Sequence, residues 1–286
     1  YGDAHPFGRP LATPAQLDGY TLEQVKAFHA TEFGAKRAHL YVAGRFDAMK
    51  VKAAIHEAFG GWAPGPEPLA LPGNHAPGPQ VILVDRPGAP QTTLRLAFDA
   101  PLAGSPDDIA HRTMNQLLGG AFSSRITTNI REAKGYTYFP VSDIDFKPGE
   151  AIWIFQADVS TEVTGASLKE VFAEIRRMQG EAPSDEEGKG IRTYMAGLFA
   201  IENSTSGAVV NTLATRDLLG LPDDWLEDYV PAVLAVTSEQ MRVAAAASLP
   251  LDKLTLIAVG DLKAIDSQLK SLPELRNIPF RTVKVP

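Results

Sequence analysis

The chain has 286 residues, 44% of them hydrophobic and 21% charged, a balance typical of globular proteins with substantial cores. Its formal net charge of −7 and pI near 5.4 argue against a protein that binds nucleic acid or anionic membranes through a basic surface. Because the chain has no Cys, disulfides, thiol chemistry and Cys-based metal sites are also excluded. The absence of Cys fits both a reducing cytosol and a bacterial periplasm, and of the two we favour the periplasm.

The first part of the chain contains two helical patterns and one strand pattern. Residues 13–33 carry an apolar stripe at helical spacing, and residues 39–44 predict a buried strand. Residues 47–59 predict an amphipathic helix that Asp47 caps and a glycine pair ends. The polar, turn-rich start predicts the interior of a longer protein and not a signal peptide. No apolar run approaches the ~20 residues that a transmembrane helix needs.

A Pro-rich segment then predicts a domain boundary. Six prolines fall between residues 63 and 79, which favours a stiff, extended linker. We therefore assign residues 1–64 to a first domain, residues 65–79 to a linker and residues 80–286 to a second domain.

The second domain alternates between strand and helix patterns. Strands are predicted at residues 80–84, 92–99, 138–146, 151–159 and 254–259. Helices are predicted at residues 105–118, 162–179, 184–202, 206–219, 237–247 and 262–269, followed by an extended tail at 272–286.

The stretch at residues 117–138, LLGGAFSSRITTNIREAKGYTY, contains the candidate site. A glycine pair at 119 and 120 ends one helix, since glycine adopts the left-handed conformation without penalty. Ser123 and Ser124 offer an N-cap for a second helix at residues 125–133. Gly135 is expected to stop that helix, and a strand is expected to follow it.

Arg131 and Tyr138 are the candidate catalytic and substrate-binding residues of this stretch. Arg131 is expected near the end of the helix and Tyr138, seven positions on, at the start of the next strand. We expect the two side chains to converge and to present a guanidinium fork and a phenol, which suit a polarised carbonyl or an oxyanion. Tyr136 is a third candidate, for substrate binding, because strand alternation sends residues 136 and 138 to the same face.

The chain also repeats itself at an offset of 216 residues. The tetrapeptide TLEQ at Thr21 matches TSEQ at Thr237, and the same offset pairs Leu40 with Leu256. Both copies predict a helix, a buried strand, a glycine and a second helix, which indicates an internal duplication. If the second copy begins near residue 80, the first copy in this sequence is truncated.

The same residues resemble a known family. The second domain of insulinase-type (pitrilysin-like) zinc metallopeptidases typically has LGG-x-x-SSR, a helix with LRE, and G-x-x-Y. The matching segments here are Leu118-Gly119-Gly120, Ser123-Ser124-Arg125, Ile130-Arg131-Glu132 and Gly135-Tyr136-Thr137-Tyr138. In addition, His5-Pro-Phe-Gly-Arg9 resembles an HPYGR-type segment of the first domain, and residues 80–270 resemble the complete second domain.

The resemblance implies an α+β fold of two related domains, each an antiparallel-dominated sheet covered on one side by helices. It also implies that Arg131 and Tyr138 reach the zinc site of the first domain and help to hold the substrate backbone. The family's zinc motif, His-x-x-Glu-His, is absent from the sequence. The motif needs a second His four residues after the first. Phe33 occupies that position after His29, and Asn115 occupies it after His111.

Two functions remain open on the sequence. The chain is either the C-terminal half of a zinc metalloendopeptidase or a catalytically silent, structural or partner subunit of a related peptidase complex. In both cases we expect zinc in the complete enzyme and none bound by this chain alone. The expected partners are a peptide substrate and a zinc-bearing N-terminal half or subunit, in a homodimer or a heterodimer.

Overall fold

The computed structural model describes residues 5–8, 11–68 and 78–284 and divides the chain into two compact units. Unit 1 comprises Tyr1–Ala76 with Glu202–Leu218, and unit 2 comprises Pro77–Ile201 with Leu219–Pro286. Most of the predicted linker, residues 69–77, lies outside the described residues. The domain ranges assigned from the sequence stay a prediction. They place residues 202–218 in the second domain, whereas in the structure this segment belongs to unit 1.

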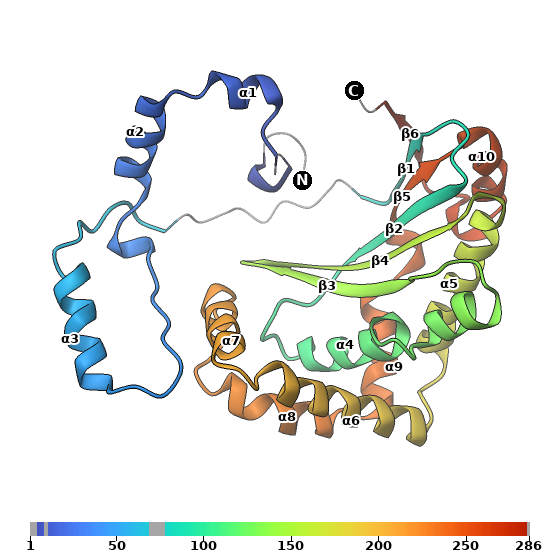
Figure 1. Ribbon diagram of the computed structural model, residues 1–286. Coiled ribbons are helices and arrows are strands. Elements are labelled where there is room, and N and C mark those ends of the chain that lie inside the picture. Colours follow the sequence, from blue (N-terminus) through green and yellow to red (C-terminus); the bar gives the residue numbers. More distant parts are fainter. Residues whose placement is uncertain (1–4, 9–10, 69–77, 285–286) are drawn as a thin grey trace. The chain divides into compact units, whose positions relative to one another are not determined.

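Unit 2 is built on a six-stranded sheet in the order β3-β4-β2-β5-β1-β6 (Figure 1). The strands are β1 (Gln80–Asp85), β2 (Gln91–Asp99), β3 (Val141–Lys147), β4 (Glu150–Ser160), β5 (Thr255–Gly260) and β6 (Phe280–Val283). Strands β3, β4, β2 and β5 pair antiparallel, whereas β1 pairs parallel with β5 and β6. The sheet is mixed with an antiparallel majority, as the α+β prediction requires.

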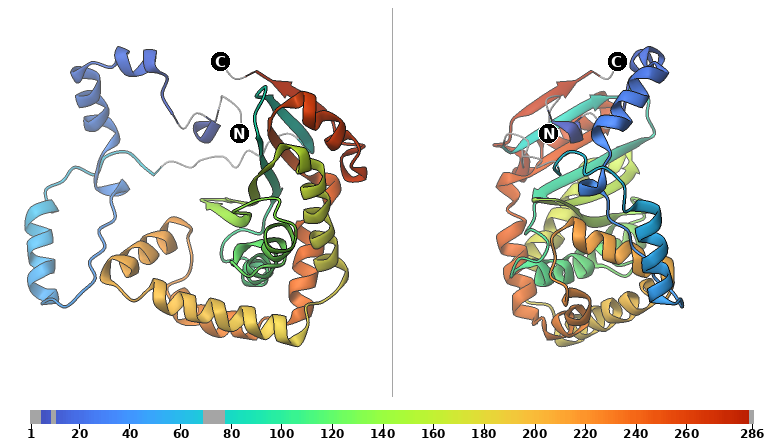
Figure 2. Two further views of the ribbon diagram at one scale, coloured as in Figure 1. Left: turned by 45° about the vertical axis from the view of Figure 1, so that its right-hand side comes forward. Right: turned by 90° about the vertical axis from the view of Figure 1, so that its left-hand side faces the viewer.

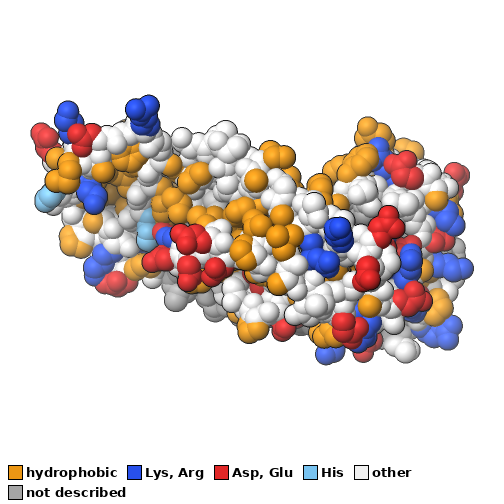
Figure 3. Space-filling model, turned by 90° about the horizontal axis from the view of Figure 1, so that it is seen from below, with side chains coloured by type: hydrophobic (Ala, Val, Ile, Leu, Met, Phe, Trp, Pro, Cys, Tyr) orange, Lys and Arg blue, Asp and Glu red, His pale blue; other side chains and the backbone are white. Residues whose placement is uncertain are grey.

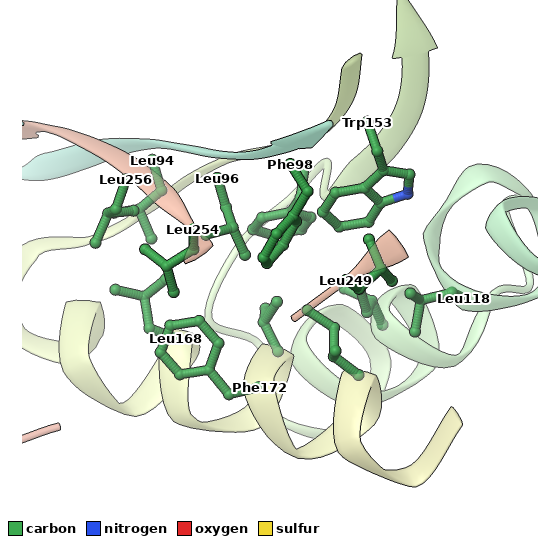
Figure 4. Close-up of a cluster of buried hydrophobic side chains, with 14 of the residues drawn as sticks. Leu94, Leu96, Phe98, Leu118, Trp153, Leu168, Phe172, Leu249, Leu254 and Leu256 are labelled. Atoms are coloured by element: carbon green, nitrogen blue, oxygen red, sulfur yellow. The ribbon is translucent and has the colours of Figure 1, made fainter. Parts of the chain in front are cut away.

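Helices cover one face of this sheet (Figures 1 and 2). The helices of unit 2 are α4 (Asp108–Asn115), α5 (Thr164–Gly180), α6 (Asp185–Glu202), α8 (Trp225–Ala235), α9 (Ser238–Ser248) and α10 (Leu262–Lys270). On β2 every second residue is buried, as expected for a sheet with one covered face. Figure 4 shows Leu94, Leu96 and Phe98 of β2 pointing at Leu168 and Phe172 of α5.

An outer helical layer lies beyond the core. The ring of Phe199 on α6 stacks on Tyr229 of α8 at a centroid distance of 4.5 Å, and Trp225 lies 5.1 Å from Tyr229. Helix α8 has no counterpart among the predicted helices, because Pro231 inside it interrupts the helical pattern. None of the described helices is long and apolar enough to cross a membrane.

Among its described residues, unit 1 contains helices and no strand. Its longer helices are α1 (Pro14–Gly19), α2 (Leu22–Glu32), α3 (Ala48–Phe59) and α7 (Ser206–Leu218). Apolar side chains that the sequence places on a buried stripe are exposed here, including Leu17 at 59%, Val25 at 55% and Phe28 at 60%. Hydrophobic side chains accordingly lie on the surface at the left of Figure 3.

The predicted strand at residues 39–44 is wrong as a description of this structure. The segment has no strand hydrogen bonding, and Leu40 and Val42 are 58% and 44% exposed. A strand needs a neighbour to satisfy its backbone N–H and C=O groups, and no described residue of unit 1 forms one. Tyr41 instead donates a hydrogen bond to Oδ2 of Asp217 on α7 at 2.7 Å.

Helices that the predicted duplication pairs begin with the same kind of cap. Thr21 caps α2 and Thr237 caps α9, each in a capping box with the Gln three residues later. Asp47 caps α3 by accepting hydrogen bonds from the backbone N–H groups of residues 49 and 50, as predicted. Because these contacts are local, they form in both predicted copies, although in the part of the chain that the structure describes strands occur in the second copy alone.

Several boundaries differ from those predicted. The stretch 13–33 is two helices, and β3 begins at residue 141, three residues later than expected. The predicted extended tail contains a short 3-10 turn and then β6, which pairs with β1 and forms the edge of the sheet.

Candidate functional site

The candidate site contains two π-helical segments, which the sequence patterns did not predict. These segments are η3 (Gln116–Gly120) and η4 (Thr127–Ala133). In η4 the amide of Lys134 donates to the carbonyl of Asn129, five residues back, at 3.1 Å. Such segments are rare and are often found at functional sites. Arg131 therefore lies on a widened turn and not on the ordinary helix expected at residues 125–133.

The glycines of this stretch have different roles. Gly135 has a φ of +66°, so it ends η4 in the left-handed conformation as predicted. Gly119 and Gly120 have no positive φ, which corrects the reason given for them from sequence. A Cβ on Gly119 would collide with Oγ of Ser142 on β3. Gly119 is thus required for the close approach of η3 to the sheet.

Arg131 and Tyr138 converge in the structure. The guanidinium carbon of Arg131 lies over the ring of Tyr138 at 5.3 Å from its centroid, and over the ring of Phe122 at 4.4 Å. The side chain of Arg131 is 21% exposed, and its Nε lies 3.3 Å from Oε1 of Glu132. Tyr138 is 82% exposed, so its ring and hydroxyl are open to a ligand.

A pocket of about 160 Å³ adjoins these side chains. It is lined mostly by apolar groups with one cation, and its lining residues are Gly120, Ala121, Phe122, Thr127, Arg131, Phe139, Pro140 and Val141. The sequence analysis did not identify Phe122 or Phe139. Their exposure, 67% and 61%, is the structural signal for them, since large apolar side chains exposed in a group often mark a binding surface.

Tyr136 and Tyr138 flank a buried residue. Thr137 forms an isolated bridge with Val159, and its Oγ1 donates to the carbonyl of Asp158 at 2.7 Å. Tyr136 is half-buried, whereas Tyr138 is exposed beside Arg131. The geometry therefore favours Tyr138 as the partner of Arg131, and Tyr136 stays a weaker candidate.

The helix corresponding by duplication to the family's zinc helix is α4, and its residues do not fit a zinc site. His111 is buried, and its Nε2 meets no hydrogen-bond partner among the described residues. Burial, with Arg112 acting in the same direction, lowers the pKa of His111 to about 4.

The position where a second His would be needed is occupied by Asn115. Its Oδ1 accepts hydrogen bonds from Nε1 of Trp153 and Oγ of Ser142, each at 2.6 Å. Asn115 thus joins α4 to β4 and β3 and is not available as a ligand. Within the part of the chain that the structure describes, no three His, Cys, Asp or Glu side chains gather as a metal site.

Comparisons with known proteins identify the family of this chain. A family model described as the peptidase M16 inactive domain matches residues 19–195. An uncharacterized zinc protease of Mycobacterium bovis is 29% identical over 203 residues, which cover 69% of this chain and 44% of that protein.

Two solved structures share the fold. The peptidase M16 inactive domain from Pseudomonas fluorescens has a TM-score of 0.74 at 23% identity, over 86% of this chain and 59% of that one. A protease from Helicobacter pylori has a TM-score of 0.78 at 19% identity, over 90% of this chain and 63% of that one.

The fold and the site therefore define an α+β domain of the metallopeptidase type. The chain belongs to the family of peptidase M16 inactive domains, which confirms the resemblance seen in the sequence. It spans less than half the length, 44%, of the Mycobacterium bovis protein that it matches.

Proposed function

We propose that this chain is the C-terminal part of a zinc metalloendopeptidase and supplies Arg131 and Tyr138 to an active site whose zinc ligands lie outside this sequence. The observation that carries the proposal is the convergence of these two side chains beside an apolar pocket. Relatives that bear the name zinc protease support the same class of reaction. The residues of this chain do not fit zinc, and no step through the metal is assigned to them.

The chemistry of the pair suits a peptide. The guanidinium of Arg131 donates hydrogen bonds in its own plane, in a fork that can hold a substrate carbonyl. The phenol of Tyr138 can donate one hydrogen bond to an oxygen on which negative charge develops. The apolar pocket beside them can accept a side chain of the same peptide while the fork holds its backbone.

The missing partner is a second part of the same proposal. The matched residues of β5 pair with β1 and β2, whereas residues 39–44 pair with no described strand. The exposed apolar stripe of α1 and α2 likewise lacks a sheet to cover. We infer that strands equivalent to β1 and β2, on the zinc-bearing half or subunit, pair with residues 39–44 and cover that stripe.

The alternative is a catalytically silent partner or structural subunit. In that case the fold would serve only to assemble a complex, and Arg131 and Tyr138 would be ordinary surface residues. The contact between Tyr138 and Arg131 beside the pocket favours the peptidase function.

The test is steady-state peptide hydrolysis by the complete, zinc-loaded protein carrying single substitutions. Tyr138→Phe removes one hydroxyl and is expected to lower kcat by roughly 10²–10³, the usual loss for one donor to an oxyanion. Arg131→Ala is expected to raise KM as well, because the fork also positions the peptide. Tyr136→Phe, the matched control, is expected to retain activity.

Wild-type kinetics for both Arg131→Ala and Tyr138→Phe would place the chain in the silent, structural class. A defect confined to Tyr136→Phe would show that the other tyrosine carries the role.

A further inference from the structure

Phe122 is the aromatic residue nearest to the guanidinium of Arg131. The centroid of its ring lies 4.4 Å from the guanidinium carbon, compared with 5.3 Å for Tyr138. A cation over the face of an aromatic ring is attracted by the ring's quadrupole. Because the guanidinium has five N–H donors, a contact between its carbon and the ring of Phe122 leaves donors available to a ligand.

The backbone places Phe122 at this position through a turn anchored on both sides. The amide of Ser124 donates to the carbonyl of Ala121 at 2.9 Å, which closes the turn that contains Phe122. Ala121 is held in turn by a 2.9 Å hydrogen bond from its amide to the carbonyl of Gln116 in η3. On the other side, the buried Oγ of Ser124 donates to Oγ1 of Thr127 at 2.9 Å.

Phe122 gains little from burial at this site. Its side chain is 67% exposed, whereas the neighbouring Ala121 is 3% exposed. A phenylalanine presented to solvent on an anchored turn contributes little to the core, so its contact with Arg131 and its place in the pocket lining are what distinguish it.

The charged neighbour of Arg131 is a weak competitor. Among the described residues, Glu132 is the one acidic side chain that pairs with Arg131, at 3.3 Å, and it is 60% exposed. Ion pairs this exposed contribute little because water screens them. The ring of Phe122 is therefore the nearer of the two aromatic rings that can hold the guanidinium beside the pocket.

We propose that Phe122 is a positioning residue, whose ring holds the guanidinium of Arg131 beside the pocket with its N–H edge free for a peptide carbonyl. This inference rests on the function proposed above. It assigns Phe122 a role through Arg131 and not through direct contact with the substrate.

A double-mutant cycle in the complete, zinc-loaded protein tests the inference. Phe122→Leu is expected to lower kcat/KM roughly two- to fivefold, the size of a cation–π contact at an exposed site, mainly through KM. Phe122→Trp keeps an aromatic face and is expected to retain wild-type kinetics. In an Arg131→Ala background Phe122→Leu is expected to have no further effect, because the group it positions is gone.

Tyr194→Leu is the matched control, since it removes another exposed aromatic ring, on α6, and is expected to leave kcat/KM unchanged. Thermal unfolding of each variant separates loss of folding from loss of positioning.

Three results would overturn the inference. The first is wild-type kinetics for Phe122→Leu while Arg131→Ala is impaired. The second is a defect of Phe122→Leu that persists in the Arg131→Ala background, which would place the ring directly on the substrate. The third is failure of Phe122→Trp to retain activity in a folded protein. Wild-type kinetics for Arg131→Ala itself would instead refute the proposed function.

Discussion

Arg125 and Glu187 form a two-point ion pair between the segment that leads into η4 and the start of α6. Nε of Arg125 lies 2.9 Å from Oε1 of Glu187, and Nη2 lies 3.0 Å from Oε2. Ser184 adds hydrogen bonds to Oε2 from its amide and its hydroxyl. The hydrogen bonds from Arg125 are the main reason that the pKa of Glu187 falls to about 2. This ion pair therefore attaches the segment that carries Arg131 to helix α6.

Glu187→Gln is expected to lower the free energy of unfolding by about 1.5–3 kcal/mol, as for hydrogen bonds to charged groups. Glu187 is 31% exposed, so the lower end of that range is expected. Because its folded pKa lies below its ordinary value of 4.5, the stabilisation is complete above pH 4.5 and is lost as the pH falls towards 2.

Urea unfolding from pH 7 to pH 2 measures this effect. The acid-dependent part of the stability should shrink in Glu187→Gln and stay unchanged in Glu186→Gln, an exposed neighbour. Equal acid dependence in wild type and Glu187→Gln would contradict the assignment.

His111 is expected to make unit 2 sensitive to mild acid. Its pKa is about 4 when buried and 6.5 in the unfolded chain, so the unfolded state binds a proton first. Stability is therefore highest above pH 6.5 and declines by up to about 3 kcal/mol as the pH falls to 4.

The variant His111→Leu should flatten the stability profile between pH 6.5 and pH 4. His56→Leu changes an exposed His on α3 and should leave the slope as it is. An unchanged slope in His111→Leu would show that another group titrates in this range.

Asn115→Leu is expected to destabilise unit 2 by about 2–4 kcal/mol. It removes the shared acceptor of Trp153 and Ser142 and leaves two buried donors unpaired, each costing roughly 1–3 kcal/mol. Chemical unfolding followed by Trp fluorescence measures the loss.

Ser142→Ala provides the coupling test. It should destabilise the wild type but cost little in the Asn115→Leu background, because the hydroxyl has already lost its partner. Additive losses would contradict the shared-acceptor geometry.

Amide exchange tests the inferred pairing of residues 39–44. In the chain of 286 residues these amides should exchange quickly, whereas those of β5, paired on both sides, should exchange slowly. Addition of the zinc-bearing half should protect residues 39–44 and leave β5 unchanged. Protection of 39–44 in the chain alone, or no change on addition, would refute the pairing.

The sequence by itself determined the features that depend on near neighbours. The cap at Asp47 formed as its pattern predicted, because it joins groups two or three residues apart, and the same local contacts explain the caps that the structure shows at Thr21 and Thr237. The seven-residue spacing of Arg131 and Tyr138 across a glycine stop was likewise enough to predict that the two side chains meet.

The tertiary structure decided what depends on distant partners. Residues 39–44 have the composition of a strand and remain unpaired, because strand hydrogen bonds need another segment. Asn115 is a structural residue because it accepts hydrogen bonds from Trp153 and Ser142, which lie 38 and 27 residues away in the sequence. The sequence analysis did not single out Phe122, and only the turn that exposes it beside Arg131 identifies it as part of the candidate site, because burial is a property of the folded chain.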